Sequence, residues 1–358
     1  MGFGLVNRLV QSAEEGENLQ IAMHGTDPTI LITKVLLPRR RDDVLTRQRL
    51  LNRLYDMVDY KLALVSAPAG YGKTTLLVDF ATDLEHPVCW YALDASDHDP
   101  HLFLQRLVMS IRRRFPGFGE ETSRALAASA DLSGGAPSVV RVLVNEIITQ
   151  IPRWFVIVLD DYHALGPSSE VDAIISNFVA AQRDQCLTII ASRTVPKLPL
   201  IIPLVARGGV GGIGQDEMRF APEEVQALFA HNYDTDLTLD DATELADQVE
   251  GWITGLLLTA YTRWEGVLQS WMRARDSREP IYDYLAQEVF GQQPEALQTF
   301  LEVTSTLAEM NLQLCEALLQ IDDAEALLEA TEGRSLFVTR LEGDWFRYHH
   351  LFAELLRT

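Results

Sequence analysis

The chain has 358 residues, of which 47% are hydrophobic and 23% are charged, enough for two or three domains with packed cores. Its 30 Lys and Arg against 51 Asp and Glu give a net charge of −21, which argues against extensive nucleic-acid binding, since that binding depends on cation contacts with phosphates. No apolar run approaches the roughly 18 residues of a membrane helix, the start lacks a signal-peptide pattern, and the three cysteines form no CxxC pair. We therefore expect a cytoplasmic protein with reduced thiols and no membrane partner.

Short apolar runs alternate with helical patterns over the first part of the chain. Residues 1–33 are weakly patterned and are expected to form an N-terminal arm. The elements predicted after them are a helix at 45–60, a strand at 61–66, a helix at 74–84, a strand at 88–93, helices at 101–115 and 139–151, a strand at 154–159, a helix at 171–180 and a strand at 187–191. This alternation predicts an α/β domain over residues 34–215, with a parallel sheet covered by helices on both faces.

The pattern changes after residue 215. Pro222 and two following glutamates open a helical stretch, so we expect a helical domain over 216–280. Residues 281–358 predict several helices, a two-stranded hairpin at 336–348 and a closing helix at 350–357, which together indicate a winged-helix domain. This last domain holds 4 Lys plus Arg and 14 Asp plus Glu, so its net charge is 4 minus 14, or −10. No direct DNA binding is expected of this chain unless a further C-terminal helix-turn-helix exists.

A glycine-rich loop joins the first predicted strand to the helix that follows. It reads APAGYGKT at residues 67–74, with Ala67 where the pattern G-x-x-x-x-G-K-[ST] begins with glycine. Small residues let backbone N–H groups converge on phosphates, Lys73 neutralises phosphate oxygens, and the Thr74 hydroxyl binds Mg²⁺. The sequence therefore predicts binding of ATP or ADP with Mg²⁺, through Pro68, Ala69, Gly70, Tyr71, Gly72, Lys73, Thr74 and Thr75.

Two carboxylates follow the most hydrophobic predicted strand. Asp160 and Asp161 are expected at the carboxyl edge of the sheet, where a carboxylate can hold Mg²⁺ directly or through water. We assign Asp160 to the metal, together with Thr74. Asp161 either polarises the attacking water or caps the turn at Tyr162 and His163, and the residues leave both readings open.

An arginine and a histidine pair are further candidates for phosphate contacts. Arg193 ends the last predicted strand, from which it would reach a γ-phosphate and report its presence; a solvated surface arginine is the alternative. His349 and His350 lie between the hairpin and the last helix, and one of them would donate to a phosphate across a domain interface. On spacing alone, ordinary packed or surface histidines are favoured.

A second glycine run, at residues 209–214, satisfies the dinucleotide pattern G-x-G-x-x-G. That pattern requires a preceding strand and a helix that opens at once, whereas polar residues follow here and the next helix is expected only near residue 222. We therefore predict a flexible loop without nucleotide.

With these residues, the chain resembles the ATPase module of the STAND signalling ATPases, in the MalT-type branch of the LuxR-family transcriptional activators. The resemblance runs from about Lys34 to the end. It rests on SAPAGYGKTTLL at 66–77, FVIVLDDYH at 155–163, TIIASR at 188–193, MRFAPEEV at 218–225, EGW at 250–252 and WFRYHHLFAELLR at 345–357.

The resemblance implies an ATPase core, a helical domain and a winged-helix domain folded around one nucleotide. It places Val44, Leu45 and Arg47 near the adenine, and it makes Arg193 the sensor arginine. His349 matches the histidine that holds the ADP phosphate in the resting state. Ile253 stands where the family usually has a proline that packs near the base.

These observations support one leading hypothesis, a slow ATPase that acts as a signalling switch. ADP bridges the domains in a closed resting form, an unidentified inducer and ATP open the module for self-association, and hydrolysis involving Asp160, Asp161 and Arg193 resets it. One alternative is a scaffold or defence protein that keeps ATP as a structural ligand with negligible turnover. Another is a phosphotransferase that acts on a small molecule.

Overall fold

The computed structural model describes residues 32–129, 132, 136–166, 169–257, 285–321, 324–334, 336–340 and 344–357. The predicted N-terminal arm, apart from its last two residues, lies outside this part of the chain. So does the predicted helical domain from residue 258 to 280. No helix within the described residues combines the length and apolar character that crossing a bilayer requires.

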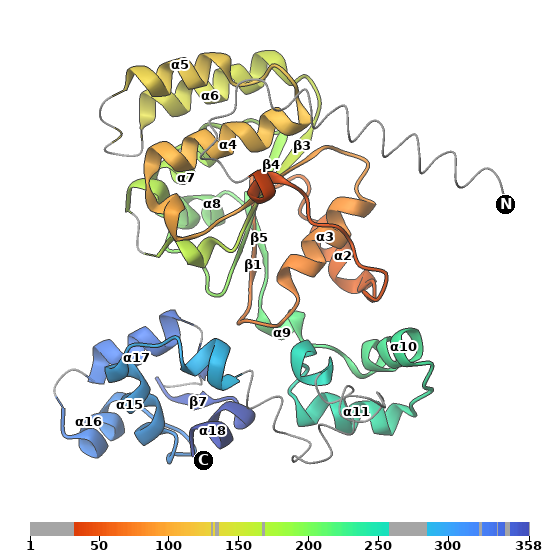
Figure 1. Ribbon diagram of the computed structural model, residues 1–358, viewed down its shortest axis with the longest axis vertical. Coiled ribbons are helices and arrows are strands. Elements are labelled where there is room, and N and C mark those ends of the chain that lie inside the picture. The colour runs from red at the N-terminus through yellow and green to blue at the C-terminus, as the bar shows by residue number, and fades with distance from the viewer. Residues whose placement is uncertain are drawn as a thin grey trace.

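A five-stranded parallel sheet forms the centre of the first domain (Figure 1). Its strands lie in the order β2-β3-β4-β1-β5. Their bounds are Leu62–Ser66 (β1), Val88–Ala92 (β2), Phe155–Asp160 (β3), Cys186–Ser192 (β4) and Val210–Ile213 (β5). Every residue of β1, β3 and β4 is buried, as expected of central parallel strands with apolar contacts on both faces. The predicted α/β fold is confirmed.

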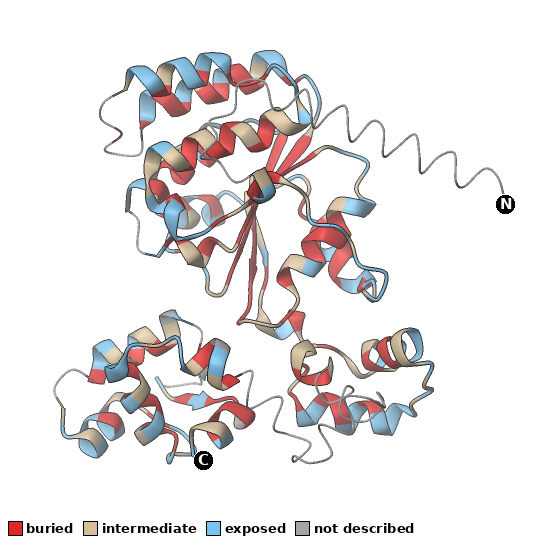
Figure 2. Cartoon of the chain, in the orientation of Figure 1, coloured by how far each residue is buried: buried red, intermediate tan, exposed pale blue. Residues whose placement is uncertain are grey.

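Helices cover the two faces of this sheet separately (Figures 1 and 2). One face packs on α2 (Gln48–Tyr55) and α3 (Lys73–Asp83), through alternate strand residues such as Val65 and Val158. The other packs on α4 (Pro100–Arg114), α6 (Pro137–Gln150) and α7 (Ser169–Ala181), and α5 (Glu120–Ala128) packs on α4 and α6. Because side chains alternate along a strand, each strand contributes to both hydrophobic cores.

The helix α5 was not predicted, because its stability depends on a residue distant in sequence. Glu146, on α6, accepts hydrogen bonds from the backbone N–H of Gly119 at 2.9 Å and of Thr122 at 2.9 Å. The Thr122 hydroxyl donates to the same carboxylate at 2.5 Å. This buried carboxylate satisfies the free N–H groups at the start of α5, a capping role that no local pattern reveals.

The prediction of a flexible loop at 209–214 is wrong for residues 210–213, which form β5 beside β1. A Cβ on Gly211 would lie 2.7 Å from the Tyr60 ring and 2.9 Å from the Met57 side chain. Only glycine at this position therefore leaves room for both side chains beside the strand. A short helix, α9 (Gln215–Met218), follows directly. The pattern is still no dinucleotide motif, since Gly211 and Gly212 lie within the strand and only Gly214 lies between the strand and α9, with no glycine-rich turn there.

After α9, the regular elements of the described chain are helices and one hairpin. The helical domain contains α10 (Pro222–Tyr233), α11 (Leu239–Gln248) and helical residues 253–257. The C-terminal part contains a π-helix (Leu285–Phe290), α15 (Glu295–Thr304), α16 (Leu312–Leu319), α17 (Ala324–Gly333), the antiparallel strands β6 (Val338–Arg340) and β7 (Phe346–Tyr348), and α18 (His350–Leu356). The predicted hairpin and closing helix are confirmed.

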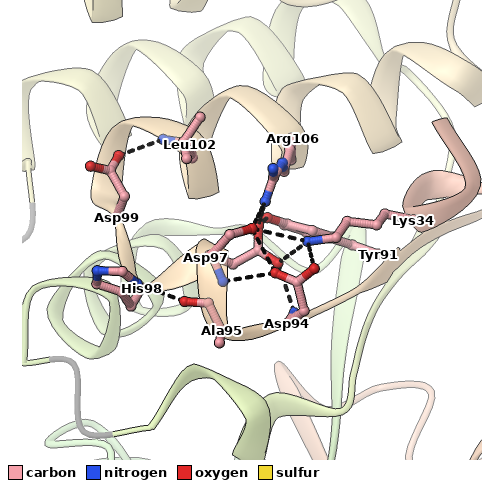
Figure 3. A network of polar contacts seen from close by, with 10 residues as sticks. Lys34, Tyr91, Asp94, Ala95, Asp97, His98, Asp99, Leu102 and Arg106 are labelled. Atoms are coloured by element: carbon pink, nitrogen blue, oxygen red, sulfur yellow. Dashed lines mark hydrogen bonds and ion pairs between the residues drawn. The ribbon is translucent and has the colours of Figure 1, made fainter. Parts of the chain in front are cut away.

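A buried polar network fixes the start of the described chain to the end of β2 (Figure 3). Lys34, in the 3-10 helix η1 (Ile32–Val35), contacts Asp94 at 2.6 Å and Asp97 at 2.8 Å. Asp97 also pairs with Arg106 of α4 and accepts the Tyr91 hydroxyl at 2.7 Å. Because the single buried carboxylate of Asp97 pairs with both Lys34 and Arg106, the stability of each ion pair depends on the other.

Candidate nucleotide-binding site

The glycine-rich loop lies between β1 and α3, as the sequence predicted. Gly70 and Gly72 have left-handed backbones with φ of 74° and 83°, which glycine adopts without a steric penalty. Gly72 precedes the first turn of α3, whose free N–H groups favour an anion. The buried Lys73 ammonium donates to the carbonyls of Ala67 at 2.8 Å and Pro68 at 3.0 Å, and burial lowers its pKa to about 8. The charges of Asp161 and Asp160 oppose this effect, and a phosphate nearby would add further counter-charge.

The two carboxylates after β3 have different environments. Asp160 is buried and accepts the Thr74 hydroxyl at 2.9 Å and the Asp161 N–H at 3.0 Å. Burial, and then the neighbouring Asp161, raise the pKa of Asp160 to about 6. The Asp161 side chain is half exposed, and its backbone is left-handed with φ of 55°. Asp160 and Thr74 thus present paired oxygen ligands of the kind that Mg²⁺ prefers, while Asp161 points into the cavity described below.

Arg193 and His163 line the same cavity as the glycine-rich loop. His163 lies in the 3-10 turn η4 (Tyr162–Leu165), and its Nδ1 is 4.0 Å from an Asp161 oxygen. Burial, and then the charges of Arg193 and Lys73, lower the pKa of His163 to about 3. Its imidazole is therefore neutral at physiological pH, and the cations in this region are Lys73 and Arg193.

Arg47, which lines the cavity as Val44 and Leu45 do, connects it to the helical domain. Its guanidinium donates to the carbonyls of Met218 at 2.8 Å and Arg219 at 2.6 Å. It pairs with Glu224 at 2.8 Å and lies 4.0 Å from the centre of the Phe220 ring. Burial lowers the pKa of Arg47, and the bond to Glu224 opposes that effect. The predicted adenine residue therefore also links the two domains.

A tight turn after α11 brings the helical domain onto the glycine-rich loop. Gly251 is left-handed with φ of 68°, and a Cβ there would lie 2.7 Å from the Arg219 Cβ, so glycine is required. The turn then presents Ile253 and Thr254 to the cavity. Thr254 donates from its N–H at 3.3 Å and from its hydroxyl at 3.0 Å to the carbonyl of Gly70.

Most of the predicted binding residues surround one cavity of about 470 Å³. Those that line it are Val44, Leu45, Arg47, Ala69, Gly70, Tyr71, Gly72, Lys73, Thr74, Thr75, Asp161, Arg193 and Ile253. Pro68, Asp160 and His349 lie outside the lining. Pro68 contributes its carbonyl to Lys73, and Asp160 lies behind Thr74. The buried His349 has its Nε2 3.3 Å from the carbonyl oxygen of Val249, in the helical domain.

The lining also contains residues that sequence reasoning did not assign to the site. They are Arg41, Asp43, Leu76, Asp79, His163, Phe220, Leu228, Asn232, Thr254 and Leu257. His163 and Phe220 lie inside motifs on which the family resemblance rests, so those motifs could have identified both as site residues. Leu228 and Asn232 come from α10, whose sequence carries no nucleotide signature.

Comparison with known proteins supports this reading of the fold and the motifs. Residues 286–358 match the family model of the MalT winged helix domain. Over 337 residues the chain is 31% identical to the HTH-type transcriptional regulators MalT of Yersinia pestis (strain Pestoides F) and Yersinia enterocolitica serotype O:8. These alignments cover 92% of this chain and 36% of each relative, so the chain spans about a third of the relatives' length.

A solved structure shows the same fold at low sequence identity. The Walker-type ATPase PABY2304 of Pyrococcus abyssi aligns with a TM-score of 0.59 at 15% identity, over 89% of this chain and 97% of that one. With a P-loop ATPase fold, a MalT winged helix domain and similarity to MalT along 92% of the chain, the predicted resemblance to the ATPase module of MalT-type transcriptional regulators is confirmed.

Proposed function

We propose that this chain is the nucleotide-dependent switch of a MalT-like transcriptional regulator in the cytoplasm. ADP occupies the cavity in a closed resting form, ATP favours a self-associating form in response to an inducer, and slow hydrolysis restores the first. The shared lining of the cavity carries this proposal, because the glycine-rich loop, residues 41–47 and the helical domain all contribute to it. A ligand that contacts two domains can shift the balance between their arrangements.

The residues of the site fit a magnesium nucleotide. Thr74 and Asp160 would hold Mg²⁺, which neutralises charge on the phosphate oxygens when it is bound. Asp161 would orient the attacking water, and Arg193 would contact the γ-phosphate, which only ATP has. Direct contact between His349 and a phosphate stays a prediction for the resting form.

DNA binding belongs, in this proposal, to a part of the complete regulator other than this chain. Residues 281–358 hold 4 basic and 14 acidic residues, a poor surface for phosphates. The winged-helix domain then acts within the chain, against the helical domain that His349 contacts.

The identity of the nucleotide in natively purified protein tests the switch. We expect near-stoichiometric ADP on denaturation, and slow release of phosphate from added ATP. Bound ATP without turnover would indicate a structural ligand, and transfer of phosphate to a metabolite would indicate a phosphotransferase. Protein that is empty and binds neither ATP nor ADP contradicts the proposal.

Replacement of Arg193 by Ala should weaken ATP binding more than ADP binding. The loss of one charge-assisted contact to the γ-phosphate predicts a decrease in ATP affinity of about tenfold or more, with ADP affinity nearly unchanged. Titration with each nucleotide by calorimetry measures the difference. Arg207→Ala is the matched control, because Arg207 is exposed and lies outside the cavity lining. Equal losses for both nucleotides would show that Arg193 does not report the γ-phosphate.

An exposed apolar face supports self-association. Ile202 (81% exposed) and Val205 lie three residues apart on α8 (Ile201–Ala206), and exposed Val195 precedes them. Residues 185–215 contain Lys and Arg but no Asp or Glu, in a chain with a net charge of −21. The helix α11 has the complementary character, an exposed Leu239 among four carboxylates. We therefore propose that α8 of one copy contacts α11 of the next copy, in a head-to-tail assembly.

The substitution Ile202→Asp should abolish ATP-dependent assembly, because it places a charge in the apolar contact. Sedimentation with ATP and with ADP measures the assembly, and the affinity for ADP, which does not drive assembly, should stay unchanged. Leu314→Asp, on a leucine of α16 that is 38% exposed, is the control and should assemble normally. Normal assembly of Ile202→Asp would exclude α8 from the contact.

A further inference from the structure

Trp252 lies between the glycine-rich loop and the winged-helix domain. Its side chain is fully buried, and the indole N–H donates to the carbonyl of Ala69 at 3.1 Å. The same ring meets Phe337 edge to face, with 5.2 Å between ring centres, and His349 with 6.3 Å between centres. One side chain of the helical domain therefore touches both the loop proposed to bind phosphate and the winged-helix domain.

The bond to Ala69 fixes the direction of a peptide group in the loop. A trans peptide is planar, so its C=O and its N–H point in opposite directions. When Trp252 holds the Ala69 carbonyl, the N–H of Gly70 in the same peptide is turned away from Trp252. The adjacent Thr254 holds the next carbonyl, that of Gly70, and thereby the N–H of Tyr71. The turn at 252–254 thus orients consecutive N–H groups in a loop whose N–H groups bind phosphate.

The winged-helix side of Trp252 has a defined geometry. The N–H of Leu351 donates to Nδ1 of His349 at 3.3 Å, which leaves Nε2 as the protonated nitrogen that faces the Val249 carbonyl. Phe337 has a left-handed backbone with φ of 53°, an uncommon and costly conformation for an aromatic residue. The His349 N–H donates to its carbonyl at 2.6 Å, which helps to hold that conformation. Phe337 and His349 therefore present their rings to Trp252 in one specific arrangement.

We propose that Trp252 is a positioning residue that couples the shape of the phosphate-binding loop to docking of the winged-helix domain. With Phe337 and His349 in place, the indole is held where its N–H reaches Ala69, and the loop keeps its phosphate-binding shape. Release of the winged-helix domain frees the indole and loosens the loop. Because coupling between sites is reciprocal, nucleotide in the loop also stabilises the docked domain. This inference rests on the proposed nucleotide site.

The substitution Trp252→Phe in the full chain tests the first half of this coupling. It keeps an aromatic ring against Phe337 but removes the N–H donor, so ADP affinity should fall by about fivefold, the effect of one neutral hydrogen bond. The change in tryptophan fluorescence on addition of ADP should disappear as well. Trp154→Phe is the matched control, since Trp154 packs on His86 and lies outside the cavity lining. It should leave both the affinity and the fluorescence change intact.

A double-mutant cycle with Phe337 tests the second half. Phe337→Leu should weaken ADP binding when Trp252 is present and have almost no further effect when Trp252 is already Phe, because the coupling passes through the indole. Tyr348→Phe controls for general loosening of the winged-helix domain, since it removes a bond to Thr304 without touching Trp252. We expect normal ADP affinity in that control.

The outcomes separate this inference from the proposed function. Wild-type protein that binds no nucleotide overturns both. Wild-type protein that binds ADP, with unchanged affinity in Trp252→Phe, overturns the coupling alone. Additive losses in the cycle, or an equal loss in Tyr348→Phe, also overturn it, because they indicate that Trp252 and the winged-helix domain act independently.

Discussion

Replacement of Lys73 by Ala is expected to weaken binding of both ATP and ADP by more than about 100-fold, the effect of removing charge-assisted contacts to two phosphates. The side chain is buried, lines the cavity, and has its ammonium held by two loop carbonyls. Calorimetry or displacement of a fluorescent nucleotide measures the loss.

The same variant should unfold no earlier than the wild-type protein in the absence of nucleotide. Burial lowers the pKa of Lys73, which means that the folded state holds this charge at a cost, and the substitution removes that cost. Lys197→Ala is the control, since Lys197 is exposed and lies outside the cavity lining. Retained affinity in Lys73→Ala would place the nucleotide elsewhere, and an early unfolding transition would show that Lys73 is structural.

Replacement of Asp97 by Ala is expected to lower the free energy of unfolding of the nucleotide-binding domain by about 3–5 kcal/mol, the usual result when one partner of a buried ion pair is lost. The substitution would leave Lys34 and Arg106 buried without their shared carboxylate, and the Tyr91 hydroxyl without its acceptor. Denaturation with urea, followed by circular dichroism, measures the change.

Asp94→Ala is the comparison for this effect. Asp94 also pairs with Lys34, but its side chain is 53% exposed, so water replaces much of the lost interaction. We expect a loss of about 1 kcal/mol or less there. Equal losses of unfolding free energy in the two variants would mean that burial of Asp97 does not increase its contribution to stability.

The sequence predicted the elements whose information is local. The strands β1 to β4 are continuous apolar runs, and the glycine-rich loop with Lys73 and Thr74 is contiguous, so spacing was enough to place them. The glycine strand β5 was missed because glycine disfavours strands, and only its neighbours Met57 and Tyr60 explain the residue. The helix α5 was missed because its capping carboxylate, Glu146, lies on another helix.

The site shows the same difference between local sequence information and contacts of distant residues. The sequence by itself determined a P-loop fold and predicted which residues would meet the phosphates, because these properties come from a short motif between a strand and a helix. Only the tertiary structure decided what surrounds that motif. It placed Trp252 against Ala69, 183 residues away, joined Arg47 to Glu224, and directed His349 to Val249 and not into the cavity. Such contacts depend on how the domains pack, and packing of distant surfaces leaves no periodic or local signal in the chain.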